Sequence, residues 1–271
     1  MLIRLSSAFC VCIVSLATGT PFAAAQAPLA PNASQLPRQS KPISDVVVPI
    51  PAEVFDSLDK FSNSNWRLVQ IDELAHAKPH GNDRQIALLL GVSIGEGFVA
   101  VEAHDAAEVK RVGAAVLGLA RALGVQPTVM RRSQSIVDLA NKNDWPAVRK
   151  EWDAVLPEVQ EGMKQIKSEQ LSQLVSVGGW LRGTRALTAL ILQRYSADDA
   201  ELLRQPALLD RFEKQLAQIR QDTSISEMQE GVRQMRSLVT SSDPIPEQSV
   251  RDLSVICDKL LATILRGTAR Q

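Results

Sequence analysis

The stretch of sequence that decides the fold is EQLSQLVSVGGWLRGTRALTALILQRY, residues 169–195. Its apolar side chains fall on nearly every face of a helix, which is typical of a helix that other helices surround. Two charged residues, Arg182 and Arg185, interrupt the apolar middle of the stretch. We therefore expect residues 169–195 to form a buried central helix.

The segments around this helix also have a helical period. From Pro49 onward, apolar residues recur at spacings of three and four, and alternating β-branched residues are few. Asp105 and Glu108 match a capping box after the apolar segment 84–103, and Gly124 is typical of a helix end. The sequence predicts an all-α fold, a compact multi-helix array of about nine or ten helices with no convincing strand.

Two segments are less regular. Residues 66–77 predict a short helix that ends before Pro79. Pro157 lies inside an apolar stripe that runs from Val148 to Ile166. Because the stripe continues past the proline, we expect a kinked helix there rather than two unrelated ones.

The N-terminus has the pattern of an export signal. Arg4 supplies the positive charge, Leu5–Ala17 forms the apolar region, and Ala23-Ala24-Ala25 is a small-residue cleavage site. We expect residues 1–25 to be a signal peptide that is cleaved after Ala25. The mature protein is then expected to be periplasmic or secreted.

The remaining chain divides into a leader and a folded body. Residues 26–48 are rich in Pro, Ala and Ser and lack periodicity, so we expect a disordered leader. Residues 49–271 are expected to form a single helical domain. Its longest apolar stretch, Gln85–Gly95, is shorter than a membrane span, so we expect no transmembrane segment in a soluble mature chain.

The composition argues against a nucleic-acid partner and against a disulfide bond. The chain has 30 basic and 30 acidic residues, so loss of Arg4 with the signal leaves a net charge of −1. The signs are interspersed, and no basic stripe for nucleic acid is present. Cys257 is the mature chain's single cysteine and lies at helical spacing among apolar residues, so we expect it to pack in the core without a disulfide.

Four segments carry a resemblance to a known family: VPIPAEVFDSLDKF (48–61), RQIALLLG (84–91), GGWLRG (178–183) and LLRQP (202–206). Over roughly residues 46–220 the chain resembles an uncharacterised family of exported all-helical bacterial proteins. The resemblance implies a bacterial periplasmic or secreted setting and an all-α fold. It implies no activity, cofactor or catalytic residue, and so it transfers no site.

The segment Gly91-Val92-Ser93-Ile94-Gly95 matches the G-x-S-x-G motif of α/β-hydrolases. That fold places its catalytic His well after the Ser, but the last histidine here is His104, and no β-α alternation surrounds the motif. The other interpretation is a helix face on which two glycines allow a neighbouring backbone to approach. We favour the helix crossing and predict no catalytic residue.

Glu73, His76 and His80 have a spacing that could place metal ligands on one helix face. Pro79 and Gly81 interrupt the helix at this point, which favours ordinary surface residues. We therefore predict no metal site and no cofactor.

Three charges lie inside strongly apolar helices: Glu96, Arg182 and Arg185. A buried charge needs a partner or a water-filled cleft. Because Gly91 and Gly95 match a pair of small residues at Gly179 and Gly183, we expect a close helix crossing that brings Glu96 to Arg182 or Arg185. The pair could fix helix register, or it could border a ligand pocket.

The candidate binding residues are therefore Glu96, Trp180, Arg182 and Arg185. No plausible triad, phosphate loop or haem motif is found in the sequence, which favours a non-enzymatic role. The leading hypothesis is an exported helical protein of unknown role that acts through protein contacts or as a scaffold. The alternative is a binding protein for a small anionic or amphipathic ligand held between helices near these four residues.

Overall fold

The computed structural model describes residues 59–61 and 63–266. All of them belong to one compact unit, Val46–Gln271. The predicted signal peptide and the predicted leader lie outside the described residues. The fold below is that of the described part alone.

All regular secondary structure of the described residues is helical, without strands, as the sequence predicts. Nine helices have nine or more residues, and short helical turns join them. The long helices are α3 (Asp83–Glu102), α4 (Ala106–Ala122), α5 (Gln126–Asn141), α6 (Trp145–Asp153), α7 (Val155–Gln165), α8 (Glu169–Gln193), α10 (Pro206–Ala217), α11 (Thr223–Thr240) and α12 (Glu247–Arg266). The short ones are η3 (Asp59–Phe61), η4 (Trp66–Val69), α2 (Asp72–Ala75), α9 (Ala197–Ala200) and η5 (Glu201–Leu203).

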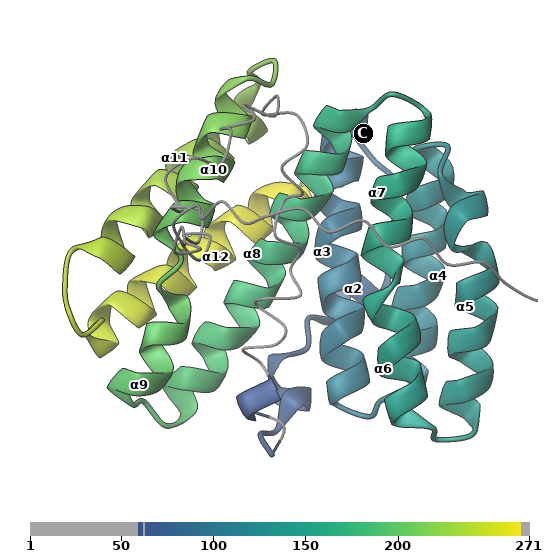
Figure 1. Cartoon of the computed structure of the whole chain (residues 1–271), viewed down its shortest axis with the longest axis horizontal. Coiled ribbons are helices and arrows are strands. Elements are labelled where there is room, and N and C mark those ends of the chain that lie inside the picture. The colour runs from purple at the N-terminus through teal and green to yellow at the C-terminus, as the bar shows by residue number, and fades with distance from the viewer. Residues whose placement is uncertain (1–58, 62, 267–271) are drawn as a thin grey trace, which may run out of the picture. The chain divides into compact units, whose positions relative to one another are not determined.

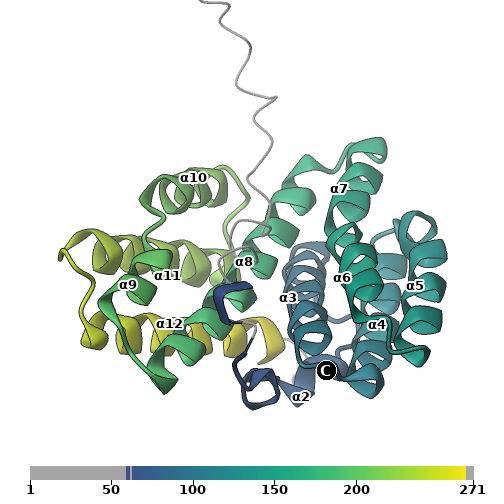
Figure 2. The same ribbon diagram turned by 60° about the horizontal axis from the view of Figure 1, so that its bottom comes forward.

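Helix α8 lies between two groups of helices (Figure 1). On one side it packs against α3 and α7, with α4, α5 and α6 beyond them, and on the other side it packs against α12. Turning the molecule keeps α9 to α12 together on one side of α8 (Figure 2). The expectation of a buried central helix at residues 169–195 is confirmed, and α3 is buried to a similar degree.

Glycines bring α3 and α8 into close contact. A side-chain carbon added to Gly91 would lie 2.0 Å from the backbone oxygen of Val175, and one added to Gly178 would lie 2.3 Å from that of Leu88. Both distances are shorter than any van der Waals contact, so a larger residue cannot fit at either position without moving a backbone. The expected glycine crossing is therefore present, and Gly179 lies in it beside Gly91 and Gly95.

Helix α3 is long and apolar enough by composition to cross a membrane. Of its most apolar 18-residue window, 89% is buried within the protein. A core helix of a globular protein passes the same test, because its apolar surface contacts other helices.

The helix predicted with a kink at Pro157 is two helices. Helix α6 ends at Asp153, and α7 begins at Val155 after Ala154. Proline has no N–H, and its ring clashes with the carbonyl group four residues earlier, here that of Asp153. The apolar stripe continues because both helices pack against the same neighbours, α3 and α5.

Candidate functional site

Glu96 of α3 and Arg182 of α8 form a buried ion pair. Arg182 Nε donates a hydrogen bond to Glu96 Oε2 at 2.5 Å, and both side chains are 0% exposed. Gly95 contributes to this contact, because a side-chain carbon at that position would lie 2.9 Å from Arg182 Cβ. Of the two partners considered for Glu96, the structure selects Arg182.

The same pair also binds the backbone of the N-terminal segment. Arg182 Nη2 donates to the carbonyl oxygen of Val69 at 2.5 Å, and the N–H of Ile71 donates to Glu96 Oε1 at 2.9 Å. These bonds explain why residues 66–77 do not form the single helix expected from the sequence. Gln70 and Ile71 are extended between η4 and α2, so that their neighbouring backbone groups reach the buried pair.

The ion pair thus makes most of its hydrogen bonds to groups of the same chain. Arg182 Nη1 is buried without a partner among the described residues, while the other polar contacts of the pair go to Val69, Ile71 and each other. A buried charge pair with this many internal bonds fixes the positions of the segments it joins. The geometry favours a structural role for Glu96 and Arg182.

Arg185 lies elsewhere on α8. Its Nε donates to Asp258 of α12, and the Arg185 side chain is 26% exposed. The bond links α8 to α12 at the protein surface. Arg185 is therefore not brought together with Glu96.

Trp180 lies on a different face of α8 from Arg182, since two residues are about 200° apart around a helix. The indole Nε1 donates to Gln205 Oε1 at 3.2 Å. The ring also packs edge-on against Phe212 of α10, with 5.4 Å between ring centroids. Trp180, one of the four candidate binding residues, borders a cavity.

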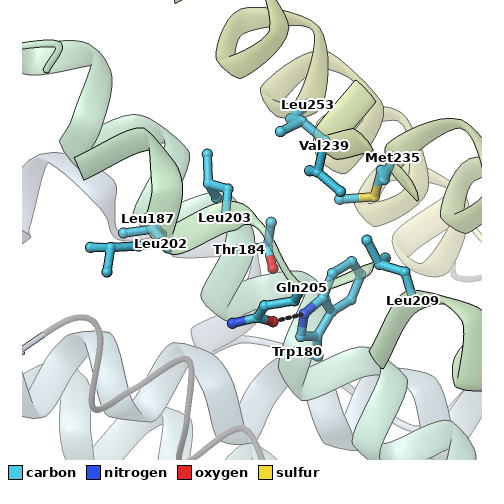
Figure 3. A pocket seen from close by; sticks show the side chains of 10 residues that line it. All are labelled: Trp180, Thr184, Leu187, Leu202, Leu203, Gln205, Leu209, Met235, Val239 and Leu253. Carbon is cyan, nitrogen blue, oxygen red and sulfur yellow. Dashed lines mark hydrogen bonds between the residues drawn. The ribbon is translucent and has the colours of Figure 1, made fainter. Parts of the chain in front are cut away.

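This cavity lies between α8, η5, α10, α11 and α12 (Figure 3). The empty space in and in front of it is about 280 Å³, part of which is open solvent, and the space that a water molecule can occupy is enough for about one. Most of its walls are apolar, and the polar side chains are those of Thr184 and Gln205. The full set of lining residues is Trp180, Thr184, Leu187, Leu202, Leu203, Gln205, Leu209, Met235, Val239 and Leu253.

A hydrogen-bonded frame positions the η5 wall. Arg204 donates to the carbonyl oxygens of Val239 at 2.5 Å and Ser242 at 2.8 Å, at the C-terminal end of α11. Glu201 pairs with Arg204 and accepts from the N–H of Ile245 at 3.1 Å. The hydrogen bond from Arg204 lowers the pKa of Glu201, so the frame stays charged at neutral pH. Leu202, Leu203 and Gln205 are therefore held against α11 independently of the Glu96–Arg182 pair.

Glu108 is a buried charged residue that the sequence assigned only to a helix cap. It is 3% exposed and pairs with Arg111, while its Oε1 is buried without a partner among the described residues. Burial raises the pKa of Glu108 despite the hydrogen bond from Arg111. Asp105 performs its half of the expected capping box, since its side chain accepts from the N–H of Glu108. The Glu108 carboxylate accepts from Arg111 instead of returning the contact, and the N–H of Asp105 donates to the carbonyl oxygen of Ala100. Only the structure shows that the Glu108 carboxyl is enclosed.

The motifs considered for chemistry have structural explanations. Ser93 lies inside α3 and is 0% exposed, so it is not on the strained turn that a hydrolase nucleophile requires. His80 contacts the carbonyl oxygens of Lys78 and Ile264. Within residues 59–61 and 63–266, no group of three or more His, Cys, Asp or Glu residues has the arrangement of a metal site.

Cys257 is fully buried on α12, as its helical spacing predicted. Burial raises the pKa of its thiol to about 12. A thiol with so high a pKa is a poor nucleophile at neutral pH, which is consistent with a packing role.

Comparison with family models, with curated proteins and with solved structures found no match to this chain. The resemblance to an exported helical family stays a prediction. The arguments that follow depend on the geometry of the described residues.

Proposed function

We propose that this protein is an exported, non-enzymatic binding protein whose cavity between α8 and α10–α12 takes the apolar part of a small amphipathic ligand. The observation that carries the proposal is the cavity itself, with the Trp180 ring and apolar side chains as its walls and Gln205 and Thr184 as its polar groups. Small-ligand sites in proteins combine apolar walls with few polar groups in the same way. Export follows from the predicted signal in residues 1–25.

The size of the cavity limits the ligand. Ligand pockets have volumes of roughly 300–1,000 Å³, whereas this cavity as it stands has room for about one water molecule, so a ligand chain enters only when side chains of its wall move. Met235 and the half-buried Leu202 can change rotamer to admit more of a chain. A narrow, flexible alkyl group therefore fits better than a fused ring system. The other hypothesis from the sequence, action through protein contacts, stays a prediction.

Native mass spectrometry of the mature protein, purified gently from its own source, tests the proposal. We expect extra mass at fixed stoichiometry that disappears on denaturation. Leu202→Phe, which enlarges a side chain of the cavity wall, should abolish the extra mass. The control is Ser133→Phe, because Ser133 borders a second apolar cavity between α4 and α5. A wild-type protein that has no extra mass and gains none on incubation with octanoate would overturn the proposal.

A further inference from the structure

The orientation of the Gln205 amide is fixed by its partner. An indole N–H can only donate, so the group that faces Trp180 Nε1 must be the acceptor oxygen of the amide. The amide nitrogen Nε2 then lies on the other side, away from Trp180 (Figure 3). The free polar atom of this cavity-lining side chain is therefore a donor and not an acceptor.

These donors have no partner within the described chain. Nε2 of Gln205 makes no hydrogen bond to any described residue, and neither does the hydroxyl group of Thr184. Gln205 is partly exposed and Thr184 is 5% exposed, and both line the apolar cavity. A ligand that left such donors without an acceptor would bind with a desolvation cost.

Among the described residues, no neighbouring charged side chain takes the place of a ligand acceptor beside Gln205 Nε2. Arg204, the next residue, uses its guanidinium group on Glu201, Val239 and Ser242. No carboxylate lines the cavity. Gln205 Nε2 can only donate, so it favours a ligand oxygen that accepts hydrogen bonds, and the Thr184 hydroxyl group, which can donate or accept, is compatible with such a ligand.

We infer that the ligand is an alkyl chain with an oxygen acceptor, such as a carboxylate or an ester carbonyl, and that Gln205 Nε2 is the donor that selects it. This inference depends on the proposed function, because it names the ligand class for the same cavity. The alkyl chain contacts the leucine-rich walls and the Trp180 ring. The acceptor receives a hydrogen bond from Nε2, and the Thr184 hydroxyl group supplies a second donor.

Gln205→Glu tests the inference, because it changes the polarity of the group and keeps its shape. One oxygen of the new carboxylate still accepts from Trp180 Nε1, while the other presents an acceptor and a negative charge to the cavity. We would titrate wild type and variant with octanoate and with octylamine and follow binding by isothermal titration calorimetry. The two probes have the same chain length and opposite hydrogen-bonding polarity.

Wild type should bind octanoate more tightly than octylamine, and Gln205→Glu should weaken octanoate binding by about tenfold or more, since a hydrogen bond to a charged group is lost. The same variant should strengthen octylamine binding. The control is Gln126→Glu, since Gln126 Oε1 also accepts a hydrogen bond, from Arg121, but outside the cavity. Gln126→Glu should leave both affinities unchanged.

The possible failures are distinguishable. If wild type binds neither probe, the proposed function itself fails. If wild type binds both probes equally, or if Gln205→Glu does not change their order, the cavity binds alkyl chains but Gln205 does not select the head group, and the inference is wrong.

Discussion

The two faces of α8 differ in how closely they pack and in whether the polar groups there have hydrogen-bond partners within the protein. Toward α3, glycines bring the backbones together, and the Glu96–Arg182 pair binds the backbone at Val69 and Ile71. Toward α10 and α11, the packing leaves a cavity, and Gln205 Nε2 and Thr184 have no partner among the described residues. A face with dense packing and a paired charge supports the fold, whereas a face with a cavity and a free amide donor is suited to a ligand.

Arg182→Met should have the largest effect on stability. Removal of one partner leaves Glu96 buried without its counter-charge, which costs about 3–5 kcal/mol of the free energy of unfolding. Urea denaturation of the folded protein measures this change.

The double variant Glu96→Leu/Arg182→Met should recover part of the loss, because no unpaired charge remains. Full recovery is not expected, since the backbone groups of Val69 and Ile71 still lose their partners. A loss below about 1 kcal/mol for Arg182→Met, the value typical of an exposed pair, would contradict the role assigned to this face.

Gly91→Ala should have the next largest effect. Its new methyl group would lie 2.0 Å from the backbone oxygen of Val175, so α3 and α8 must separate. Overpacking of this kind costs about 1–3 kcal/mol.

Gly118→Ala is the matched control for that variant. It also replaces a helical glycine, but a side-chain carbon there meets nothing within 4 Å. It should stabilise the protein by about 0.5–1 kcal/mol, because alanine restricts the unfolded chain. Equal effects of the two substitutions in thermal unfolding would show that the crossing is less tight than described.

Glu108→Gln should change the pH dependence of stability. Because the folded protein raises the pKa of Glu108, it binds the proton more tightly than the unfolded chain does. Stability from this group is greatest when it is protonated, and it falls as pH rises from the unfolded value of 4.5 through the folded value. Glutamine does not titrate, so the stability of Glu108→Gln should lack this decrease with rising pH. The free energy of unfolding of the variant relative to wild type should therefore rise from pH 4 to pH 7. A parallel pH profile for the two proteins in urea denaturation would refute the prediction.

Leu202→Phe should have the smallest effect on stability. Leu202 is half-buried at the cavity, so the added ring can occupy existing space instead of displacing the backbone. We expect a change of less than about 1 kcal/mol in the free energy of unfolding. A loss like that of Gly91→Ala would mean that the cavity face is packed as tightly as the α3 face.

The sequence alone predicts much of the α3 face. Helical periodicity locates α3 and α8, and the cost of burying a charge predicts that Glu96 has a partner. It does not decide between Arg182 and Arg185, because residues three apart share much of one helix face. The packing of α12 against α8 distinguishes the two arginines, since Asp258 of α12 pairs with Arg185.

The cavity face is not predictable in the same way. The Trp180–Gln205 bond joins residues on two helical segments whose relative position depends on the whole fold. The sequence singles out Trp180 as a large aromatic residue, but nothing in it singles out Gln205. The bonds from Val69 and Ile71 to the buried pair are backbone contacts, which side-chain patterns do not encode.

The most direct test of the division between the two faces is octanoate binding by Arg182→Met and by Leu202→Phe, measured by calorimetry under conditions where both are folded. We predict that Arg182→Met, although less stable, binds octanoate like wild type, and that Leu202→Phe, although as stable as wild type, does not bind it. Loss of binding in folded Arg182→Met, or normal binding by Leu202→Phe, would contradict the account.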